Sequence, residues 1–222
     1  MTQLATRTLS EHESKQLLAS VGVPVLEERL ATDADDAVDA AHELGAPGEP
    51  VVLKLCGAGV AHKTERGLVR LGLRSDDDVR EAAEMLVASA SPEDVAVGVL
   101  VAPMVRGGRE LIAGVHRDAQ FGPCVMVGIG GVLAEAIGDV AFRVVPVELV
   151  DAEEMLDDLS TQTLLGSFRG EPPLDRAALT GVVLGLSRLA DSHPEIVSVD
   201  VNPLVVVDGR PVAVDALVEV AQ

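Results

Sequence analysis

The sequence has 222 residues, of which 48 % are hydrophobic and 24 % charged, enough to bury a core as one large domain or two small lobes. Its formal net charge of −19 repels nucleic acids and anionic membrane surfaces. With three Phe and neither Tyr nor Trp, the chain also has no aromatic platform on which single-stranded bases would stack.

Ser10 and Glu13 form a capping box that begins a helix, and this helix ends at Gly22. Helix and strand patterns then alternate, which is typical of an α/β or α+β protein with mixed sheets. We expect two lobes, residues 1–100 and 101–222. In chain order, the pattern predicts a strand at 25–30, a helix at 33–44, strands at 51–55 and 68–73, a helix at 76–90, strands at 95–105, 110–117, 124–127 and 140–147, helices at 151–165 and 175–189, and a hairpin of 196–207 with 211–220 around Asp208-Gly209.

We recognise no targeting signal in the sequence. Residues 1–9 lack the apolar stretch of a secretory signal, and no apolar run approaches the roughly 18 residues that span a membrane. The two cysteines, Cys56 and Cys124, are far apart and have no metal-ligand spacing, which is typical of buried thiols in a reducing compartment. We therefore expect a cytoplasmic protein.

A lysine interrupts the apolar strand at 51–55. Lys54 is one of three lysines in the chain, and Lys63 is another. A buried lysine costs free energy unless an anion lies beside it, so Lys54 is a candidate phosphate ligand. Gly57 and Gly59 follow, and glycines let backbone N–H groups approach phosphate oxygens closely. The alternative is a strand-end lysine whose ammonium extends into water.

His62 lies in the same glycine loop, directly before Lys63 and Thr64. Because imidazole titrates near neutral pH, a histidine on a flexible loop offers a neutral nitrogen that can accept a phosphoryl group and pass it on. Phosphoryl transfer otherwise needs mainly positioning and charge neutralisation. The alternative is an ordinary surface-loop histidine.

The final hairpin carries oxygen-bearing side chains inside Val-rich strands. Asp200 and Asn202 are two residues apart and so lie on one face of their strand, while Asp215 on the return strand can lie opposite them. Carboxylate and amide oxygens suit Mg²⁺, which takes its other ligands from water and nucleotide phosphates. The alternative is a set of strand-edge side chains that face water. Glu110, at the start of another strand, is a further candidate for binding a ribose hydroxyl or a metal.

Seven segments of the chain together resemble the ATP-grasp (beta) subunit of ADP-forming acyl-CoA (acetyl-CoA) synthetases, a family related to succinyl-CoA synthetase. The resemblance extends from residue 10 to residue 219, and the His62-Lys63-Thr64 loop is among its specific parts. The segments that carry it are residues 52–54, 57–64, 110–114, 117–123, 128–131, 139–143 and 200–204.

The resemblance implies an ATP-grasp fold, in which two lobes clasp a nucleotide. It implies the reaction acyl-CoA + phosphate + ADP ⇌ acid + CoA + ATP, which proceeds through an acyl phosphate and phosphohistidines. In the family, the histidine that matches His62 relays the phosphoryl group to ADP, and the lysine that matches Lys54 binds nucleotide phosphate. The stretch Val101, Ala102 and Pro103 matches the hinge that reads adenine through its backbone.

The resemblance also supplies metal ligands and a partner. Asn202 and Asp215 match the Mg²⁺ ligands, whereas the family carries Glu at the position of Asp200, which therefore ranks third. An alpha subunit of the family binds CoA and carries the first catalytic histidine, and we recognise no CoA-binding Rossmann domain in this chain. We expect an acid–thiol ligase subunit that uses ATP or ADP with Mg²⁺ and assembles with a CoA-binding alpha partner as a heterotetramer.

Two other functions stay open at this point. One is a non-catalytic ATP-grasp module that senses nucleotide and regulates a partner acyltransferase, although the intact set of Lys54, His62, Asn202 and Asp215 argues against loss of activity. The other is a free-standing ATP-grasp ligase that joins a carboxylate to an amine, and 222 residues leave little room for the substrate lobe that it needs.

Overall fold

The computed structural model describes residues 5–45, 48–60, 62–131 and 138–222. These residues form two compact units, a smaller one of residues 8–13 and 26–105, and a larger one of residues 5–7, 14–25 and 106–222. The chain thus divides after residue 105, and residues 14–25 belong with the carboxyl-terminal half. Within the described ranges, no helix is both long and apolar enough to cross a membrane.

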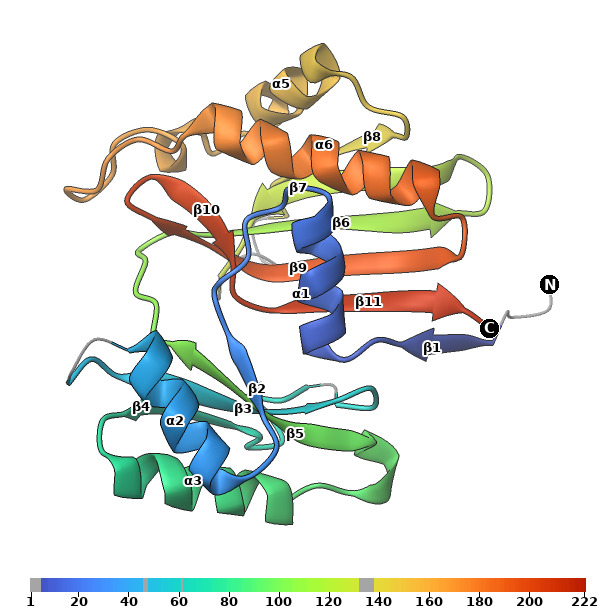
Figure 1. Ribbon diagram of the computed structural model, residues 1–222. Helices are drawn as coiled ribbons and strands as arrows, with labels where there is room; N and C mark the ends of the chain where they lie inside the picture. The colour runs from blue at the N-terminus through green and yellow to red at the C-terminus, as the bar shows by residue number, and fades with distance from the viewer. Residues whose placement is uncertain (1–4, 46–47, 61, 132–137) are drawn as a thin grey trace. The chain divides into compact units, whose positions relative to one another are not determined.

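A four-stranded antiparallel sheet in the order β2-β5-β3-β4 forms the centre of the smaller unit. Asp33 caps the first helix by accepting a hydrogen bond from the Asp36 amide, and Ser75 caps the second. The elements are β2 (Arg29–Ala31), α2 (Ala34–Leu44), β3 (Val51–Gly57), β4 (Val69–Leu73), α3 (Asp76–Ala88), the short 3₁₀ helix η1 (Pro92–Asp94) and β5 (Ala96–Pro103) (Figure 1).

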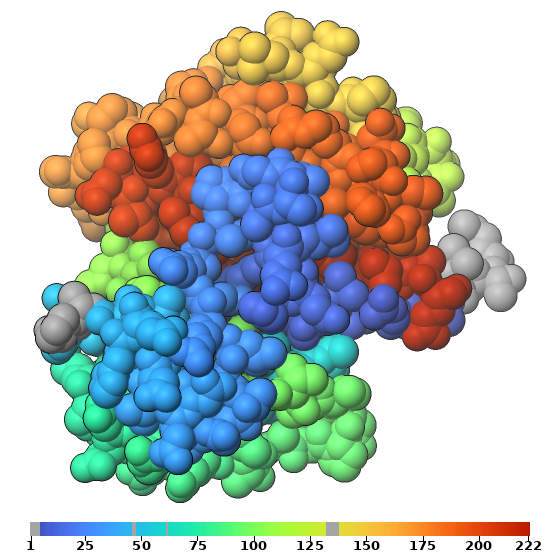
Figure 2. Space-filling view, in the orientation of Figure 1, coloured from blue at the N-terminus to red at the C-terminus, as the bar shows by residue number. Residues whose placement is uncertain are grey.

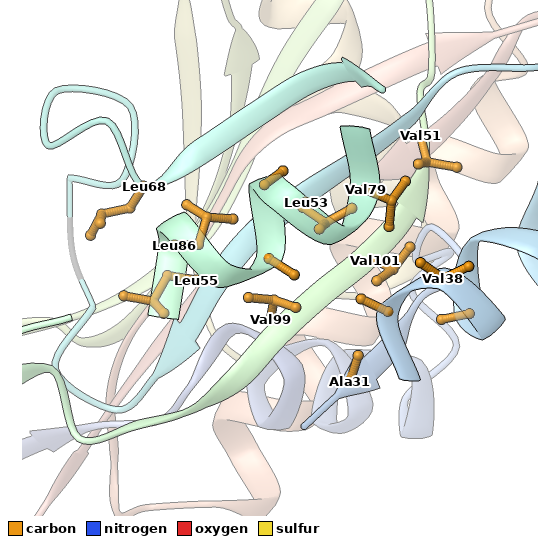
Figure 3. Packing of buried hydrophobic residues seen from close by; sticks show 14 of the residues in the cluster. Ala31, Val38, Val51, Leu53, Leu55, Leu68, Val79, Leu86, Val99 and Val101 are labelled. Carbon is orange, nitrogen blue, oxygen red and sulfur yellow. The ribbon is translucent and has the colours of Figure 1, made fainter. Parts of the chain in front are cut away.

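Strand β3 is buried along its whole length. Val51, Leu53 and Leu55 belong to the hydrophobic cluster formed with helices α2 and α3, for example with Leu86 (Figure 3). Because side chains alternate along a strand, Lys54 lies on the opposite face of β3. Glu11 of the same unit lies on that side, where its carboxylate accepts a hydrogen bond from the Lys54 ammonium.

A seven-stranded sheet forms the centre of the larger unit, in the order β1-β11-β9-β6-β7-β8, with β10 paired to β9. Neighbouring strands from β11 to β8 pair antiparallel. The elements are β1 (Thr6–Thr8), α1 (Glu11–Ser20), β6 (Glu110–Asp118), β7 (Gly122–Ile129), β8 (Val140–Val144), α5 (Leu149–Asp158), the short 3₁₀ helix η2 (Gln162–Leu164), α6 (Arg176–Ser192), β9 (Ile196–Val207), β10 (Arg210–Ala213) and β11 (Ala216–Ala221). Thr8 of β1 and residues 11–13 of α1 belong to the smaller unit.

Helices cover one face of this larger sheet. Helix α6 contacts β6 and β7, and the Ser14 hydroxyl of α1 accepts a hydrogen bond from the Val218 amide of β11. In the space-filling view, the orange atoms of α6 and the blue atoms of α1 lie over this sheet (Figure 2). The side chains that face the helices are buried, as Val199 and Val201 of β9 illustrate. Asp200 and Asn202 alternate with them along the strand and are exposed on the other face of the sheet.

Three predicted elements differ from those in the structure. The strand predicted at 25–30 is reduced to β2, and the helix predicted at 151–165 ends at Asp158. This helix stops because the Asp139 carboxylate accepts hydrogen bonds from the Ser160 and Thr161 amides at 2.8 Å each. The return strand predicted at 211–220 is split into β10 and β11, because Pro203 opposite the break has no N–H for the ladder.

Candidate functional site

His62 lies at the exposed tip of a segment that connects β3 to β4. We call residues 57–68 the His62 segment, of which residue 61 lies outside the described ranges. The Leu68 amide donates to the Lys63 carbonyl at 2.7 Å, and the Arg66 amide donates to the His62 carbonyl at 3.1 Å, so the tip is a tight turn. The His62 side chain is 75 % exposed, and its φ of 51° is in the left-handed region. Its ring nitrogens are therefore accessible to a phosphate donor.

Gly57 and Gly59, at the start of the His62 segment, pack against the backbone of η1 and the beginning of β5. A Cβ at Gly59 would lie 1.9 Å from the Glu93 carbonyl oxygen, and one at Gly57 would lie 2.3 Å from that of Asp94. The Gly59 amide donates to the Asp94 carbonyl at 3.0 Å. Close packing is thus a sufficient physical reason for glycine at both positions, and nucleotide binding by Gly57 and Gly59 stays a prediction.

A buried carboxylate joins the two lysines of the smaller unit. The Lys54 ammonium lies 2.6 Å from Glu11 Oε1, and the Lys63 ammonium lies 2.8 Å from Glu11 Oε2. The Glu11 side chain is 2 % exposed and the lysine side chains are 10 % and 9 % exposed. Lys54 therefore does not extend into bulk water. Both ammonium groups thus lie at a buried carboxylate, and the binding of nucleotide phosphate by Lys54 and Lys63 stays a prediction.

A second ion pair holds the other end of the tip. Arg66 donates from both terminal nitrogens to the two carboxylate oxygens of Asp94, at 2.7 and 2.8 Å. The Ser91 amide and hydroxyl donate to the same carboxylate. This bidentate geometry and the buried position of Asp94 fix the segment against η1.

The predicted adenine hinge, Val101 to Pro103, forms the end of β5. Val101 pairs with both neighbouring strands, since it lies opposite Arg29 of β2 and Leu53 of β3. Ala102 and Pro103 lie beyond the last residue that pairs with β2, and their register partners are on β3 alone. The backbone at the end of β5 is thus the kind of partly paired edge that can hydrogen-bond a base.

The predicted metal ligands belong to the larger unit. Asp200 and Asn202 are exposed on the same face of β9, as predicted. Asp215 lies in the break between β10 and β11, next to Ala216, which pairs with Val201. Loss of hydration by partial burial, and then the negative charge of Asp215, raise the pKa of Asp200. The two carboxylates are therefore close enough to repel each other, as expected of groups that share a cation.

The donor chemistry of these side chains fits Mg²⁺, although the protein supplies only part of the ligand shell. Among the described residues, no group of three or more His, Cys, Asp or Glu side chains could hold a metal. Two carboxylates and one amide oxygen match an ion that keeps several waters and binds substrate phosphates. A cation between Asp200 and Asp215 would also remove the repulsion that raises the pKa of Asp200.

Glu110 begins β6 and is exposed. Its carbonyl accepts a hydrogen bond from the Gly130 amide at 2.8 Å, and its carboxylate lies 3.5 Å from where a Cβ of Gly131 would be. A side chain at Gly131 would therefore be in ordinary van der Waals contact with this carboxylate. Binding of a ribose hydroxyl by Glu110 stays a prediction.

The structure therefore groups the predicted residues by unit. Lys54, Lys63, His62 and the hinge belong to the smaller unit, and the candidate metal ligands with Glu110 belong to the larger one. Sequence reasoning did not find Glu11, Asp94 or Arg66. A buried lysine signals that a carboxylate must lie beside it, but the chain has 36 acidic residues and nothing local identifies the partner.

Comparisons with known proteins agree on one family. Residues 2–220 match the ATP-grasp domain family. The chain is 37 % identical over 213 residues to the beta subunit of acetate–CoA ligase [ADP-forming] I from Pyrococcus furiosus, covering 95 % of this chain and 90 % of that subunit. The name of that relative implies a partner subunit.

Solved structures of similar proteins lead to the same family. Acetyl-coenzyme A synthetase 1 of Ca. Korarchaeum cryptofilum, solved with coenzyme A and Ca-AMPCP, is 37 % identical and has a TM-score of 0.89, with 97 % of this chain and 94 % of that chain covered. Two further structures of this archaeal enzyme differ in the stated orientation of a phosphohistidine segment. One has it phosphorylated in the site I orientation (36 % identity, TM-score 0.84, 97 % and 94 % covered), and the other, with Mg-AMPPCP, has it pointing towards the nucleotide binding site (36 % identity, TM-score 0.80, 96 % and 92 % covered).

Proposed function

Since this chain belongs to the ATP-grasp beta subunits of ADP-forming acyl-CoA synthetases, we propose that it is the nucleotide-binding subunit of an acid–thiol ligase. The reaction is acid + CoA + ATP ⇌ acyl-CoA + ADP + phosphate. The observation that carries the proposal is the exposed His62 at the tip of a segment fixed at both ends by ion pairs. The similar enzyme of Ca. Korarchaeum cryptofilum has a phosphohistidine segment that was solved in two orientations, and this supports a carrier role for the His62 segment.

His62 acts as the phosphoryl carrier. A neutral ring nitrogen attacks the terminal phosphorus of ATP, an N–P bond forms, and the P–O bond to ADP breaks with its electron pair on ADP. The second ring nitrogen then gives its proton to water. Transfer back to ADP reverses these steps, so the chain both charges and discharges the carrier.

The remaining predicted residues bind the nucleotide. Lys54 and Lys63 supply positive charge for its phosphates, and the backbone at Val101 to Pro103 contacts the adenine. Gly57, Gly59 and Glu110 are further contacts. Neutralising the phosphate charge needs no covalent chemistry from the protein, so these groups bind and orient.

Asn202 and Asp215, with Asp200 as the third candidate, hold Mg²⁺. When bound, the ion withdraws charge from the phosphate oxygens that it contacts. The carboxylates would orient the nucleotide through the ion, which would lie between their negative charge and that of the phosphates.

The partner is the subunit that completes the reaction. A beta chain that carries the phosphoryl group needs a second protein that binds CoA and the acyl group, and we propose a CoA-binding alpha subunit in a heterotetramer. The acyl specificity then belongs to that partner, because the residues of this chain act on phosphate and nucleotide.

Histidine labelling tests the proposal. The full-length chain is incubated with Mg²⁺ and ATP labelled in its terminal phosphate, and we expect an acid-labile, base-stable label on His62. His62→Ala should lose the label, while His42→Ala, at another exposed histidine, should keep it. Nucleotide binding without any label, in the chain alone and with a CoA-binding partner, would contradict the carrier role.

A further inference from the structure

Strand β8 presents an uncharged apolar surface in a chain whose net charge is −19. Val140, Phe142 and Val144 are 37 %, 53 % and 50 % exposed, and we call them the β8 strip. They alternate with the other two residues of the strand and therefore lie on one face of the sheet. Among the described residues of the larger unit, the exposed large hydrophobic side chains all fall between residues 121 and 150, and half of them form the strip.

β8 is also an edge strand. It ends the strand order of the larger sheet, and within the described ranges no strand pairs with its outer side (Figure 1). Arg143 is its one charged residue. The Arg143 guanidinium is turned to helix α5, where it lies 2.7 Å from the Asp158 carboxylate and 3.7 Å from that of Glu154. The face that carries the strip thus has neither a charge nor a proline to prevent pairing with another strand.

The edge strands β1, β2 and β4 are protected in ways that β8 is not. β1 and β2 are three residues long, and each contains an arginine, Arg7 and Arg29. β4 has an irregular register with β3 and contains Gly72, whose φ of 76° is in the left-handed region. Short length, charge and irregular register all discourage the addition of a further strand. β8 instead pairs with β7 in regular register from Val140 to Val144, so its outer side is the better template.

We propose that β8 joins two copies of this chain, by antiparallel pairing of the two β8 strands about a two-fold axis at Phe142. Phe142 then lies opposite Phe142 of the second copy, and Val140 lies opposite Val144 of the second copy. Arg143 lies opposite Ala141 of the second copy, so no like charges meet across the pair. The strand is therefore complementary to itself in apolar surface and in charge, which identifies a second copy as its occupant. The inference goes beyond the proposed function and does not depend on it.

Two effects of opposite sign determine how tightly the copies associate. Aromatic and β-branched side chains directly opposite one another stabilise antiparallel strands, and pairing removes the strip from water. The net charge of −19 on each copy opposes the association, and salt weakens this repulsion. Because the strip itself is uncharged, we expect added salt to strengthen the dimer.

Sedimentation velocity of the full-length chain between about 1 and 100 µM tests the association. The wild type should pass from monomer to dimer over this range, and raising NaCl from about 0.05 to 0.5 M should lower the dimer Kd at least about threefold. Phe142→Asp should raise the Kd at least about a hundredfold, because the substitution enters a symmetric interface twice. A wild type that stays monomeric throughout would overturn the proposal.

Leu71→Asp is the matched control. Leu71 is 64 % exposed and lies on the edge strand β4, so the substitution makes the same kind of change on the edge of the other sheet. It should leave the dimer Kd within about twofold of the wild-type value. A dimer that Leu71→Asp dissociates and Phe142→Asp does not would place the interface elsewhere and contradict the role of β8.

Disulfide trapping tests the register and also decides the proposal if Phe142→Asp fails to fold. Directly opposed residues of antiparallel strands have Cα atoms about 4.5 to 5.5 Å apart, which a disulfide can bridge. In a Cys124→Ser background, in which the remaining Cys56 is buried, Phe142→Cys should cross-link to a second copy of itself. Val140→Cys mixed with Val144→Cys should cross-link at least about tenfold more than either variant alone. Equal cross-linking in all combinations would mean random collision, and the proposal would be wrong.

A CoA-binding partner subunit is the alternative occupant of β8. If the chain alone is monomeric and Phe142→Asp weakens only its binding to an added CoA-binding subunit, the strip belongs to that contact and self-association is wrong. Labelling of His62 from ATP keeps the two proposals apart. Phe142→Asp should label within about twofold of the wild-type rate, since the strip has no part in the carrier chemistry. A dimeric wild type without label would contradict the carrier function alone.

Discussion

Asp94 shows how one buried carboxylate can hold a surface segment. The Arg66 guanidinium and the Ser91 donors hold the pKa of Asp94 well below its usual range. The carboxylate is buried, whereas the Arg66 side chain is 36 % exposed, so water screens part of the attraction. Its contribution therefore comes mainly from the hydrogen bonds to a desolvated anion.

Asp94→Asn should lower the free energy of unfolding by about 2 kcal/mol at neutral pH, because charge-assisted hydrogen bonds are replaced by weaker ones. A pKa that is depressed in the folded state gives stability that is present above the unfolded value, near 4. The difference between wild type and variant should thus be constant above pH 5 and shrink as the pH falls below about 4. Urea titrations across this pH range measure it, and a difference that grew towards low pH would contradict the assignment.

Asp200 has the opposite perturbation, since partial burial and Asp215 raise its pKa. A carboxylate with a raised folded pKa destabilises the protein when it is ionised, and this penalty disappears as the pH falls through the folded value. Asp200→Asn should therefore raise the melting temperature at neutral pH by about 1 to 3 °C. The gain should vanish at acidic pH.

The same variant tests the order of the metal ligands. If Asn202 and Asp215 hold the ion, Asp200→Asn should retain most of the additional stabilisation that ADP gives when Mg²⁺ is present. Asn202→Ala and Asp215→Ala should lose that Mg²⁺-dependent part. Loss of it in Asp200→Asn alone would make Asp200 the principal ligand.

At the scale of elements, the packing of the His62 segment against η1 and β5 depends on two missing side chains. A Cβ at Gly57 or Gly59 would meet backbone oxygen at 2.3 or 1.9 Å, and backbone cannot rotate away as a flexible side chain can. Gly59→Ala should therefore destabilise the protein by about 3 kcal/mol. Thermal or urea unfolding measures the change.

Gly181 in helix α6 is the matched control. A Cβ there meets nothing within 4 Å, so Gly181→Ala should stabilise the protein by about 0.5 to 1 kcal/mol through the helix propensity of alanine. A Gly59→Ala variant as stable as the wild type would show that the segment can separate from β5 without cost.

Elements defined by local chemistry could be predicted from the sequence. Asp33 caps its helix, Ser10 and Glu13 exchange their capping hydrogen bonds, and Asp208-Gly209 forms the predicted turn with both φ angles positive. Errors arose where a distant residue decides the outcome. Asp139 ends helix α5 from outside it, and Pro203 interrupts the pairing of another strand.

The candidate site divides in the same way. The family and its fold were predicted correctly from short motifs, because the residues of each motif are adjacent in the sequence and can be recognised there. Ion pairs such as Glu11 with Lys63 join residues that are far apart in the chain, and the sequence pattern contains no signal for them. The roles of His62, Lys54 and the metal ligands stay predictions that the labelling and binding experiments decide.

At the scale of the whole molecule, 36 acidic residues oppose 17 lysines and arginines. Several of the cations form half-exposed pairs, for example Arg29 with Asp36 at 2.7 Å and Arg143 with Asp158 at 2.7 Å. Such exposed pairs contribute little to stability, and salt weakens them. The unbalanced acids repel one another over longer distances, and salt weakens that repulsion too.

The repulsion among the acidic residues should destabilise the protein more than the exposed ion pairs stabilise it. Moderate salt, which weakens both, should therefore stabilise this protein. Raising NaCl from 0.05 to 0.5 M at neutral pH should increase the melting temperature by about 3 to 6 °C, with most of the rise complete once the Debye length is a few ångströms. Near pH 4.5, the sequence isoelectric point, the net charge is close to zero and the salt effect should disappear. A melting temperature that falls with salt at neutral pH would mean that ion pairs such as those of Arg29 and Arg143 contribute more to stability than the net charge removes.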